Sequence, residues 1–507
     1  MITHIETVRQ RPVWQAPADE TRRRFTRPLP NGSRELGDVL DDVRTHIMPF
    51  ATGNLHPLFL GWVHGAGTPV GMVAEIVASG LNMNCGGRDH AGLVVEQQIV
   101  RWMSEALGYP DGASGLFLTG SSMANFVALT IARTEVLGQT VRETGLRSER
   151  QLVAYTSAQA HSCIAQAMQL SGIGSANLRM VEVDAAGRML PDALRTIIGE
   201  DRAKGFLPFL VVGTAGTVNT GAIDPLGDIA DIASRENLWF HVDGAIGALA
   251  MLSDSLRDLF KGIERSASVA LDFHKWGQVP YDAGFLLVRD GDAQKRTFAQ
   301  PAAYLQRADR GLAAGETWPC DLGPDLSRGF RALKTWMTIE SLGADRIGQS
   351  IAHTCMLARY LAQRLERHPA FELKAPVALN IVCFGIRGGS DEFVRTLVLD
   401  LQESGLAAPS WTTINGELVV RCAIVNHRTT VTDIDGFMDI SPAPSPIVVL
   451  AASLRGHGIS MPMPLAPDAD MRSAYRPIVP TSFTDISALD CAKPFTGRPV
   501  DAGPGFE

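Results

Sequence analysis

The sequence has no long apolar run, no basic tract and no start of signal-peptide type. Its longest compact apolar stretch, residues 447–454, is far shorter than the roughly 18 apolar residues of a membrane helix, and residues 1–24 hold no apolar core. Lys and Arg number 46 against 54 Asp and Glu, and the longest basic run is Arg22–Arg24. With a net charge of −8, we expect a cytoplasmic protein whose partners include neither a membrane nor a nucleic acid.

Paired cysteines are missing as well. None of the seven cysteines is spaced as C-x-x-C, so neither a disulfide framework nor a structural zinc site is indicated. The composition, 45% hydrophobic and 20% charged, is that of a globular protein, and 507 residues predict two or three domains.

What the sequence does contain is an alternation of strand-like apolar runs with helix-period stretches between residues 107 and 289. Such an alternation predicts an α/β fold with a mainly parallel sheet and helices on both faces, whose active site lies at the carboxyl ends of the strands. The apolar runs are residues 115–119, 152–156, 207–212, 238–242, 269–272 and 284–288.

Four segments follow from the pattern. We interpret residues 1–80 as an N-terminal arm, irregular to about residue 34, followed by a helical segment in which apolar residues recur at three and four residue steps. Residues 81–340 would form the large domain and residues 341–440 a smaller α+β domain. Residues 441–507, rich in proline and without a clear period, predict a C-terminal extension.

One candidate site residue is Lys275, which follows the apolar run 269–272 within the sequence Asp-Phe-His-Lys-Trp. A lysine at a strand end can be partly desolvated, which lowers its pKa and makes it a good imine-forming amine. A lone lysine beside an aromatic residue is more often a surface side chain, so the motif needs support from others.

A second candidate, Asp243, ends the apolar run 238–242 and precedes small residues. A buried carboxylate needs a cationic or hydrogen-bonding partner, and a pyridinium nitrogen would be one. A helix N-cap is the alternative explanation.

Three further motifs follow apolar runs. Gly120, Ser121 and Ser122 precede a helical period, where glycine and hydroxyl groups at a helix N-terminus can bind phosphate or merely cap the helix. His161 follows the run 152–156 and could stack on an aromatic ring or fill the core. Thr217 lies in a Gly- and Thr-rich segment after the run 207–212 that could be only a turn.

Taken together, these motifs resemble the group II decarboxylases, the fold type I pyridoxal-phosphate family that includes the aromatic amino acid, glutamate and histidine decarboxylases. The resemblance covers residues 35 to 440 and implies a homodimer acting on an amino acid. It implies that Lys275 binds the cofactor covalently, that Asp243 pairs the pyridinium nitrogen, and that His161 stacks over the ring. The cofactor site would also include Gly120, Ser121, Ser122, Thr217, Ala245 and His274.

The same resemblance places the substrate pocket near the His56-Pro57-Leu58-Phe59 sequence. Phe59 and Trp62 would form a flat apolar wall, which favours an aromatic substrate. The Ser327-Arg328 element and Arg421 also match the family. These matches oppose the alternative of another fold type I enzyme, such as an aminotransferase or a cysteine desulfurase.

Two departures from the family pattern bear on the reaction. Asp272 stands where the family has Asn-Pro or Asp-Pro, and we leave it out of the site because a carboxylate repels phosphate. Residues 306–325 contain no tyrosine, although the family's mobile loop carries the tyrosine that returns a proton to the α-carbon; Tyr281 or Tyr304 could take its place. We expect decarboxylation to the amine and carbon dioxide, with oxidative formation of an aldehyde, or a catalytically silent relative, as alternatives.

Overall fold

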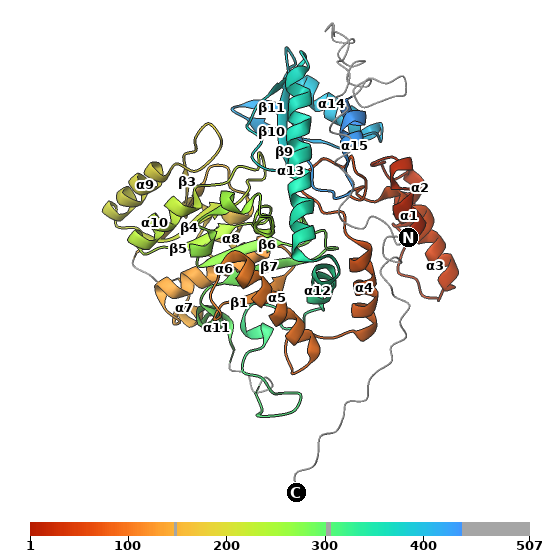
Figure 1. Cartoon of the computed structure of the whole chain (residues 1–507). Coiled ribbons are helices and arrows are strands. Elements are labelled where there is room, and N and C mark those ends of the chain that lie inside the picture. Colours follow the sequence, from red (N-terminus) through yellow and green to blue (C-terminus); the bar gives the residue numbers. More distant parts are fainter. Residues whose placement is uncertain (147–149, 301–305, 439–507) are drawn as a thin grey trace.

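A computed structural model describes residues 1–146, 150–300 and 306–438 (Figure 1). Its main body is a seven-stranded sheet in the order β1-β7-β6-β5-β4-β2-β3. Strand β7 runs antiparallel to β1 and β6, and the other neighbouring strands are parallel, so the expected mainly parallel sheet is confirmed. The strands are β1 (Ser114–Leu118), β2 (Leu152–Ser157), β3 (Leu178–Val181), β4 (Leu207–Thr214), β5 (Trp239–Asp243), β6 (Ser268–Asp272) and β7 (Gly284–Val288).

Alternate residues of each strand enter different cores, which explains the continuous apolar runs. In β2, Val153 and Tyr155 pack with helices α5 (Ala91–Leu107), α9 (Pro191–Ala203) and α10 (Leu226–Glu236). Leu152 and Ala154 pack instead with α6 (Ser121–Leu137) and α8 (Cys163–Leu170). Helix α11 (Gly291–Phe298) joins α6 on that second face through Ala293. The large sheet is therefore covered by helices on both faces.

Strand β3 was not expected from the sequence. It has only four residues and lies at the edge of the sheet, where Met180 is exposed and Arg179 interrupts the apolar run. A short strand with one polar and one exposed position lacks the signal that marks the buried strands.

A second, antiparallel sheet in the order β10-β11-β9-β8 forms the smaller unit. Helix α12 (Arg331–Leu342) leads into α13 (Ala344–Arg367), which stands between the two sheets in Figure 1. Ile351 of α13 packs in the core of the large sheet, and Leu361 packs in the core of the small one. The remaining elements here are β8 (Phe371–Leu373), β9 (Ile381–Ile386), α14 (Asp391–Glu403), β10 (Ser410–Ile414), β11 (Glu417–Ala423) and α15 (Val431–Met438).

The N-terminal region is more ordered than expected. Helices α1 (Ile2–Glu6) and α2 (Asp19–Arg24) occur in the stretch that we expected to be irregular, and Ile5 of α1 and Thr21 of α2 are buried. The expected helix near residues 35–50 begins as α3 (Leu36–Asp42) and continues as shorter turns. The other elements are η1 (Val8–Gln10), η2 (Val43–Ile47), η3 (Met48–Phe50), α4 (Pro69–Leu81), α7 (Val141–Thr144), η4 (Ser175–Asn177), η5 (Ala248–Leu252), η6 (Arg257–Phe260), η7 (Ile263–Arg265) and η9 (Pro319–Asp321).

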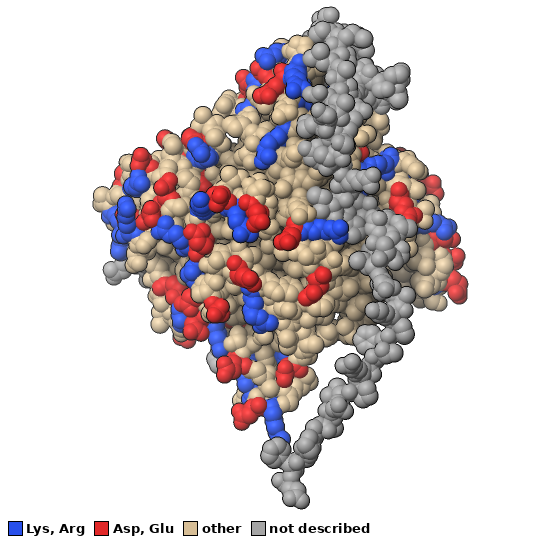
Figure 2. Space-filling view, in the orientation of Figure 1, with Lys and Arg blue, Asp and Glu red and all other residues tan. Residues whose placement is uncertain are grey.

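The positions of the two sheets support the division into a large unit over 81–340 and a small unit over 341–440, which we keep as a proposal. The extension expected over residues 441–507 lies outside the described residues. On the visible face of the large unit, acidic and basic side chains are interspersed (Figure 2). No helix in the described part of the chain is long and apolar enough to cross a membrane.

Candidate active site

The carboxyl ends of β4, β5 and β6 and the N-terminus of α6 surround a cavity of about 460 Å³. Parallel strands end at one edge of the sheet, so residues distant in sequence meet there. The expected site residues that line this cavity are Trp62, Gly120, Ser121, Ser122, His161, Asp243, Ala245, His274 and Lys275.

Lys275 lies on the turn after β6, and its Nζ is 2.8 Å from Oδ2 of Asp272. Burial opposes the charged amine, but the carboxylates of Asp272 and Asp243 outweigh burial and raise the pKa of Lys275 above its usual value. The sequence led us to expect a lowered pKa, and that expectation is wrong for the unloaded chain. The ion pair with Asp272 is what raises the pKa of Lys275.

Asp272, which the sequence analysis set aside, also lines the cavity. Its Oδ1 accepts a hydrogen bond of 2.8 Å from the backbone N–H of Ser121 and lies 3.7 Å from Nε2 of His274. Burial raises the pKa of this carboxyl, yet Lys275 and His274 outweigh that effect and hold the pKa below its usual value. In the unloaded chain Asp272 is therefore an ionised group at the centre of the site.

Asp243 ends the neighbouring strand β5 and is 4% exposed. Its Oδ1 accepts a hydrogen bond of 3.2 Å from the backbone N–H of Ala245. Burial raises the pKa of Asp243, and the charge of Lys275 offsets only part of this effect. A buried carboxylate of this kind favours a cationic partner in the cavity.

The N-terminus of α6 presents a cradle suited to an anion. The Oγ of Ser121 is buried, lines the cavity and has no hydrogen-bond partner among the described residues. The hydroxyl of Thr214, at the end of β4, is likewise buried and without a hydrogen-bond partner among the described residues, and Thr214 also lines the cavity. Gly120 crosses so close to Gly284 that a Cβ atom on Gly284 would lie 2.3 Å from the Cα of Gly120. Unsatisfied hydroxyls at a helix N-terminus fit a phosphate group.

A series of hydrogen bonds runs from His161, which is exposed, to the buried residues Cys163, Asn125 and His241. His161 accepts a hydrogen bond of 3.2 Å at Nδ1 from the backbone N–H of Cys163. The Sγ of Cys163 accepts one of 3.3 Å from Asn125, whose Oδ1 is 2.7 Å from Nε2 of His241. Burial lowers the pKa of His241 to about 3, so this ring is neutral and donates to Asn125 from Nε2. No local pattern in the sequence predicts these hydrogen bonds, because the residues come from separate elements.

Aromatic rings form one wall of the cavity. Trp62, His64 and Tyr281 line it, and the rings of Tyr281 and His274 lie 4.3 Å apart. The side chain of Tyr281 is half exposed, and its partial burial, with the charge of Asp272, raises its pKa to about 12. Phe59 does not line the cavity: it is buried against Val13 and Ala408 and stacks on Trp62 and His64, so its contact with substrate stays a prediction.

Arg421 of β11 joins the small sheet to this wall. Its guanidinium donates to the backbone oxygens of Val218 at 2.6 Å and Trp62 at 3.1 Å. Thr217, the residue before Val218, does not line the cavity, because its Oγ1 accepts a hydrogen bond of 3.1 Å from the N–H of Ala222 and closes a turn. Its place in the cofactor site stays a prediction, since its neighbours Gly216 and Val218 do line the cavity.

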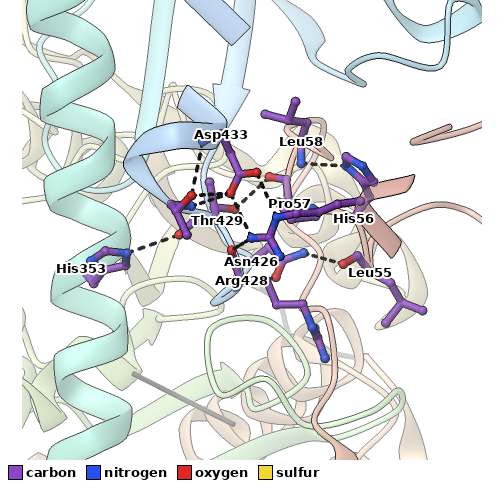
Figure 3. A network of polar contacts seen from close by, with 11 residues as sticks. Leu55, His56, Pro57, Leu58, His353, Asn426, Arg428, Thr429 and Asp433 are labelled. Carbon is purple, nitrogen blue, oxygen red and sulfur yellow. Dashed lines mark hydrogen bonds and ion pairs between the residues drawn. The ribbon is translucent and has the colours of Figure 1, made fainter. Parts of the chain in front are cut away.

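The His56-Pro57 element lies in a polar network at the small unit rather than in the cavity (Figure 3). His56 accepts a hydrogen bond of 3.0 Å at Nδ1 from the N–H of Leu58, and the Thr429 hydroxyl donates to the Pro57 oxygen at 2.8 Å. Burial lowers the pKa of His56 to about 4. This element anchors the chain that leads to Trp62.

The stretch without tyrosine, residues 306–325, packs against the rest of the chain. Trp318 is buried beneath the guanidinium of Arg307, which lies 3.5 Å from the ring centroid. Arg328, which follows this stretch, is buried and pairs with Glu96 at 2.6 Å. Tyr304 lies outside the described residues, whereas Tyr281 places a phenol at the cavity.

Comparison with known proteins points to one family. Residues 18–387 match the pyridoxal-dependent decarboxylase conserved domain. An aromatic-L-amino-acid decarboxylase from Bacillus atrophaeus is 32% identical over 445 residues, which are 85% of this chain and 90% of that protein. A phenylacetaldehyde synthase from Arabidopsis thaliana is 29% identical over 414 residues, which are 78% of this chain and 83% of that protein. The crystal structure of mouse CSAD matches with a TM-score of 0.79 at 25% identity, covering 86% of this chain and 95% of its own, which confirms the expected fold class.

Proposed function

The chain belongs to the pyridoxal-dependent decarboxylase family, and we propose that it converts an L-amino acid with an aromatic side chain into the amine and carbon dioxide. The observation that carries this proposal is the meeting of Lys275, Asp243 and the unsatisfied Ser121 hydroxyl in one cavity. An amine, a buried carboxylate and an anion cradle are the groups that a pyridoxal phosphate needs.

Each end of the cofactor has a matching group. Gly120, Ser121 and Ser122 would hold the phosphate at the N-terminus of α6. Asp243 would keep a proton on the ring nitrogen, whose positive charge gives this buried carboxylate its missing partner. The face of the ring would lie against His161, with Ala245 and His274 as its other neighbours.

Pyridoxal phosphate, when bound, draws electrons from the α-carbon of the substrate, which lets the carboxyl group leave as carbon dioxide. Lys275 would bind the cofactor until substrate replaces it, and the freed amine then serves as an acid or base and releases product. The hydrogen bond from the backbone N–H of Cys163 would hold the ring of His161 in a fixed orientation.

Tyr281 is our candidate for the proton donor to the α-carbon. It lines the same cavity as Lys275, and its raised pKa keeps the phenol protonated at neutral pH. A group that still holds its proton can deliver it once carbon dioxide has left. This supports the amine as the product even though residues 306–325 contain no tyrosine.

Aldehyde formation is the second candidate function. The absence of tyrosine from residues 306–325 and the likeness to the phenylacetaldehyde synthase support it. In this reaction the amino acid, O₂ and water would give the aldehyde, carbon dioxide, ammonia and hydrogen peroxide. A catalytically silent relative is a third alternative, which the presence of Lys275, Asp243 and His161 in one cavity opposes.

A panel of amino acids under air, with carbon dioxide, amine, aldehyde and peroxide all measured, tests the proposal. We expect amine equal to carbon dioxide, little peroxide, and higher kcat/KM for L-tyrosine or L-tryptophan than for L-glutamate, because Trp62 and Trp411 line the cavity. Peroxide equal to carbon dioxide would favour the aldehyde reaction. Cofactor binding without turnover of any amino acid would favour the silent relative.

We also propose a cytoplasmic homodimer. Leu36 and Leu40 of α3 and Ile76 of α4 are exposed apolar side chains on the chain alone, and such faces are typical of subunit contacts. Light scattering should give twice the chain mass. Ile76→Asp should yield a monomer, whereas Leu170→Asp, at an equally apolar exposed residue of α8, should leave the dimer intact.

A further inference from the structure

We infer that Asp272 and the phosphate group of the cofactor hold one proton between them in the loaded site, so that cofactor binding takes up a proton. The inference rests on the proposed phosphate cradle and not on which product the enzyme releases. It assigns Asp272 a role as a direct neighbour of the cofactor phosphate.

The first step is the position of the carboxylate. Its Oδ1 accepts the Ser121 N–H at 2.8 Å, and a Cβ atom on Gly120 would lie 3.8 Å from that same oxygen. The Ser121 Oγ beside it is buried and without a partner among the described residues. An anion bound by the N-terminus of α6 therefore contacts Asp272, which is 3% exposed and receives little screening from water.

The second step is the balance of charge. In the unloaded chain, Lys275 at 2.8 Å compensates Asp272. A phosphate held by Gly120, Ser121 and Ser122 would add negative charge beside Asp272 once the cofactor engages Lys275, and Asp243, a further acid, stands at the next strand end. Two buried anions in contact cannot both stay fully ionised, as in paired carboxylates, so one proton is retained.

The third step is the place of that proton. His274 is the other base here, with Nε2 3.7 Å from Asp272, but its Nδ1 accepts a hydrogen bond of 3.1 Å from the N–H of Ala283. A second ring proton would break that bond, and burial already disfavours the charged ring. Tyr281 faces the site as a neutral phenol with a raised pKa. The contact between Asp272 and the phosphate is therefore where the proton stays.

Asp272→Asn removes the like charge and places an amide donor against the phosphate. Calorimetry of the unloaded full-length protein with pyridoxal phosphate, in buffers of different ionisation enthalpy, counts the protons taken up. We expect about one proton fewer for Asp272→Asn than for the wild type, and a Kd about tenfold lower at pH 8. The wild-type Kd should rise by up to about tenfold per pH unit above neutrality, and that of Asp272→Asn much less.

Asp282→Asn is the matched control, since this acid lies on the same loop but pairs with Arg331 at 2.9 Å. It should keep the wild-type proton count. An Asp272→Asn protein with the wild-type proton count and Kd overturns the inference. Titration with inorganic phosphate repeats the test without the covalent bond to Lys275, and the same difference in proton count is expected.

A measurement on the wild-type holoenzyme covers the case in which Asp272→Asn does not fold. Phosphorus NMR together with the infrared carboxyl region should show either a phosphate below full ionisation or a protonated carboxyl at pH 7.5. A fully ionised phosphate with no protonated carboxyl overturns the inference. A protein that takes up the proton but releases no amine refutes the proposed reaction and leaves the inference standing.

Discussion

The ends of β5 and β6 carry the same residue in nearly the same burial, yet their acids behave in opposite ways. Asp243 is 4% exposed and Asp272 is 3% exposed. Burial raises the pKa of Asp243, whereas Lys275, 2.8 Å from Asp272, holds the pKa of that carboxyl below its usual value. The difference shows that a charged partner within hydrogen-bond distance, rather than the degree of burial, decides the direction in which each pKa moves. Asp243 at the end of β5 lacks a cation within hydrogen-bond distance, whereas Asp272 at the end of β6 has Lys275.

We expect the largest effect from removing Lys275, whose charge acts on both Asp243 and Asp272. Lys275→Ala takes away the amine that would bind the cofactor and the cation that pairs Asp272. We expect turnover to fall by at least about a thousandfold and the absorbance band at roughly 420 nm, the expected signature of the bound cofactor, to disappear. Retention of both band and activity would refute the assignment of Lys275.

Asp243→Asn tests the acid that lacks a cation. An amide cannot hold a proton on the ring nitrogen, so we expect kcat to fall by about a hundredfold. The band of the bound cofactor should remain, because Lys275 is intact. Steady-state kinetics with the spectrum check this, and unchanged kcat would contradict the proposed role.

The stability of the unloaded protein should move in opposite directions for the two acids. Asp272→Asn loses a buried charged hydrogen bond and should lower the free energy of unfolding by about 2 kcal/mol at pH 7. Asp243→Asn removes a buried carboxylate without a close cation and should raise it by about 1 kcal/mol. Urea denaturation after cofactor removal measures both, and shifts of the same sign would contradict the comparison.

The pH dependence of these differences has a defined sign. The lowered pKa of Asp272 gives stability that is present above the unfolded pKa of about 3.9 and lost as pH falls through the folded value. The raised pKa of Lys275 gives stability that is lost as pH rises through its folded value, above about 10.4. The deficit of Asp272→Asn should therefore be constant near neutrality and shrink at both extremes.

A smaller effect concerns Tyr281, whose pKa responds to Asp272. Tyr281→Phe removes the phenol, so the ratio of aldehyde to amine should rise by about tenfold while carbon dioxide release changes little. Product analysis under air measures this ratio. Tyr109→Phe, at a buried tyrosine that hydrogen-bonds Ser266, is the control and should leave the ratio unchanged.

Six of the seven strands of the large sheet could be predicted because helices bury both faces, which makes each of these six a continuous apolar run, whereas the edge strand β3 could not. The strand ends then brought Gly120, His161, Asp243 and Lys275 into one cavity as expected. Phe59 and Thr217 lie beside the residues that line the cavity rather than among them, because a motif gives a position in the chain but not the direction of a side chain.

Other features of the site depend on contacts that no local pattern carries. Asn125 meets His241 across 116 positions of sequence, and nothing near either residue indicates the contact. Asp272 was set aside on its charge alone, because the compensating distance to Lys275 and the Ser121 N–H appear only in three dimensions.

Helix α13 also sets how the molecule can move. Because one half of this 24-residue helix belongs to the core of the large sheet and the other half to that of the small sheet, it acts as a rigid strut. A hinge motion between the sheets would have to bend the helix or empty one core. The small sheet, which carries Arg421, is thus held in place against the large sheet, whose strand β6 leads to Lys275, as soon as the chain folds.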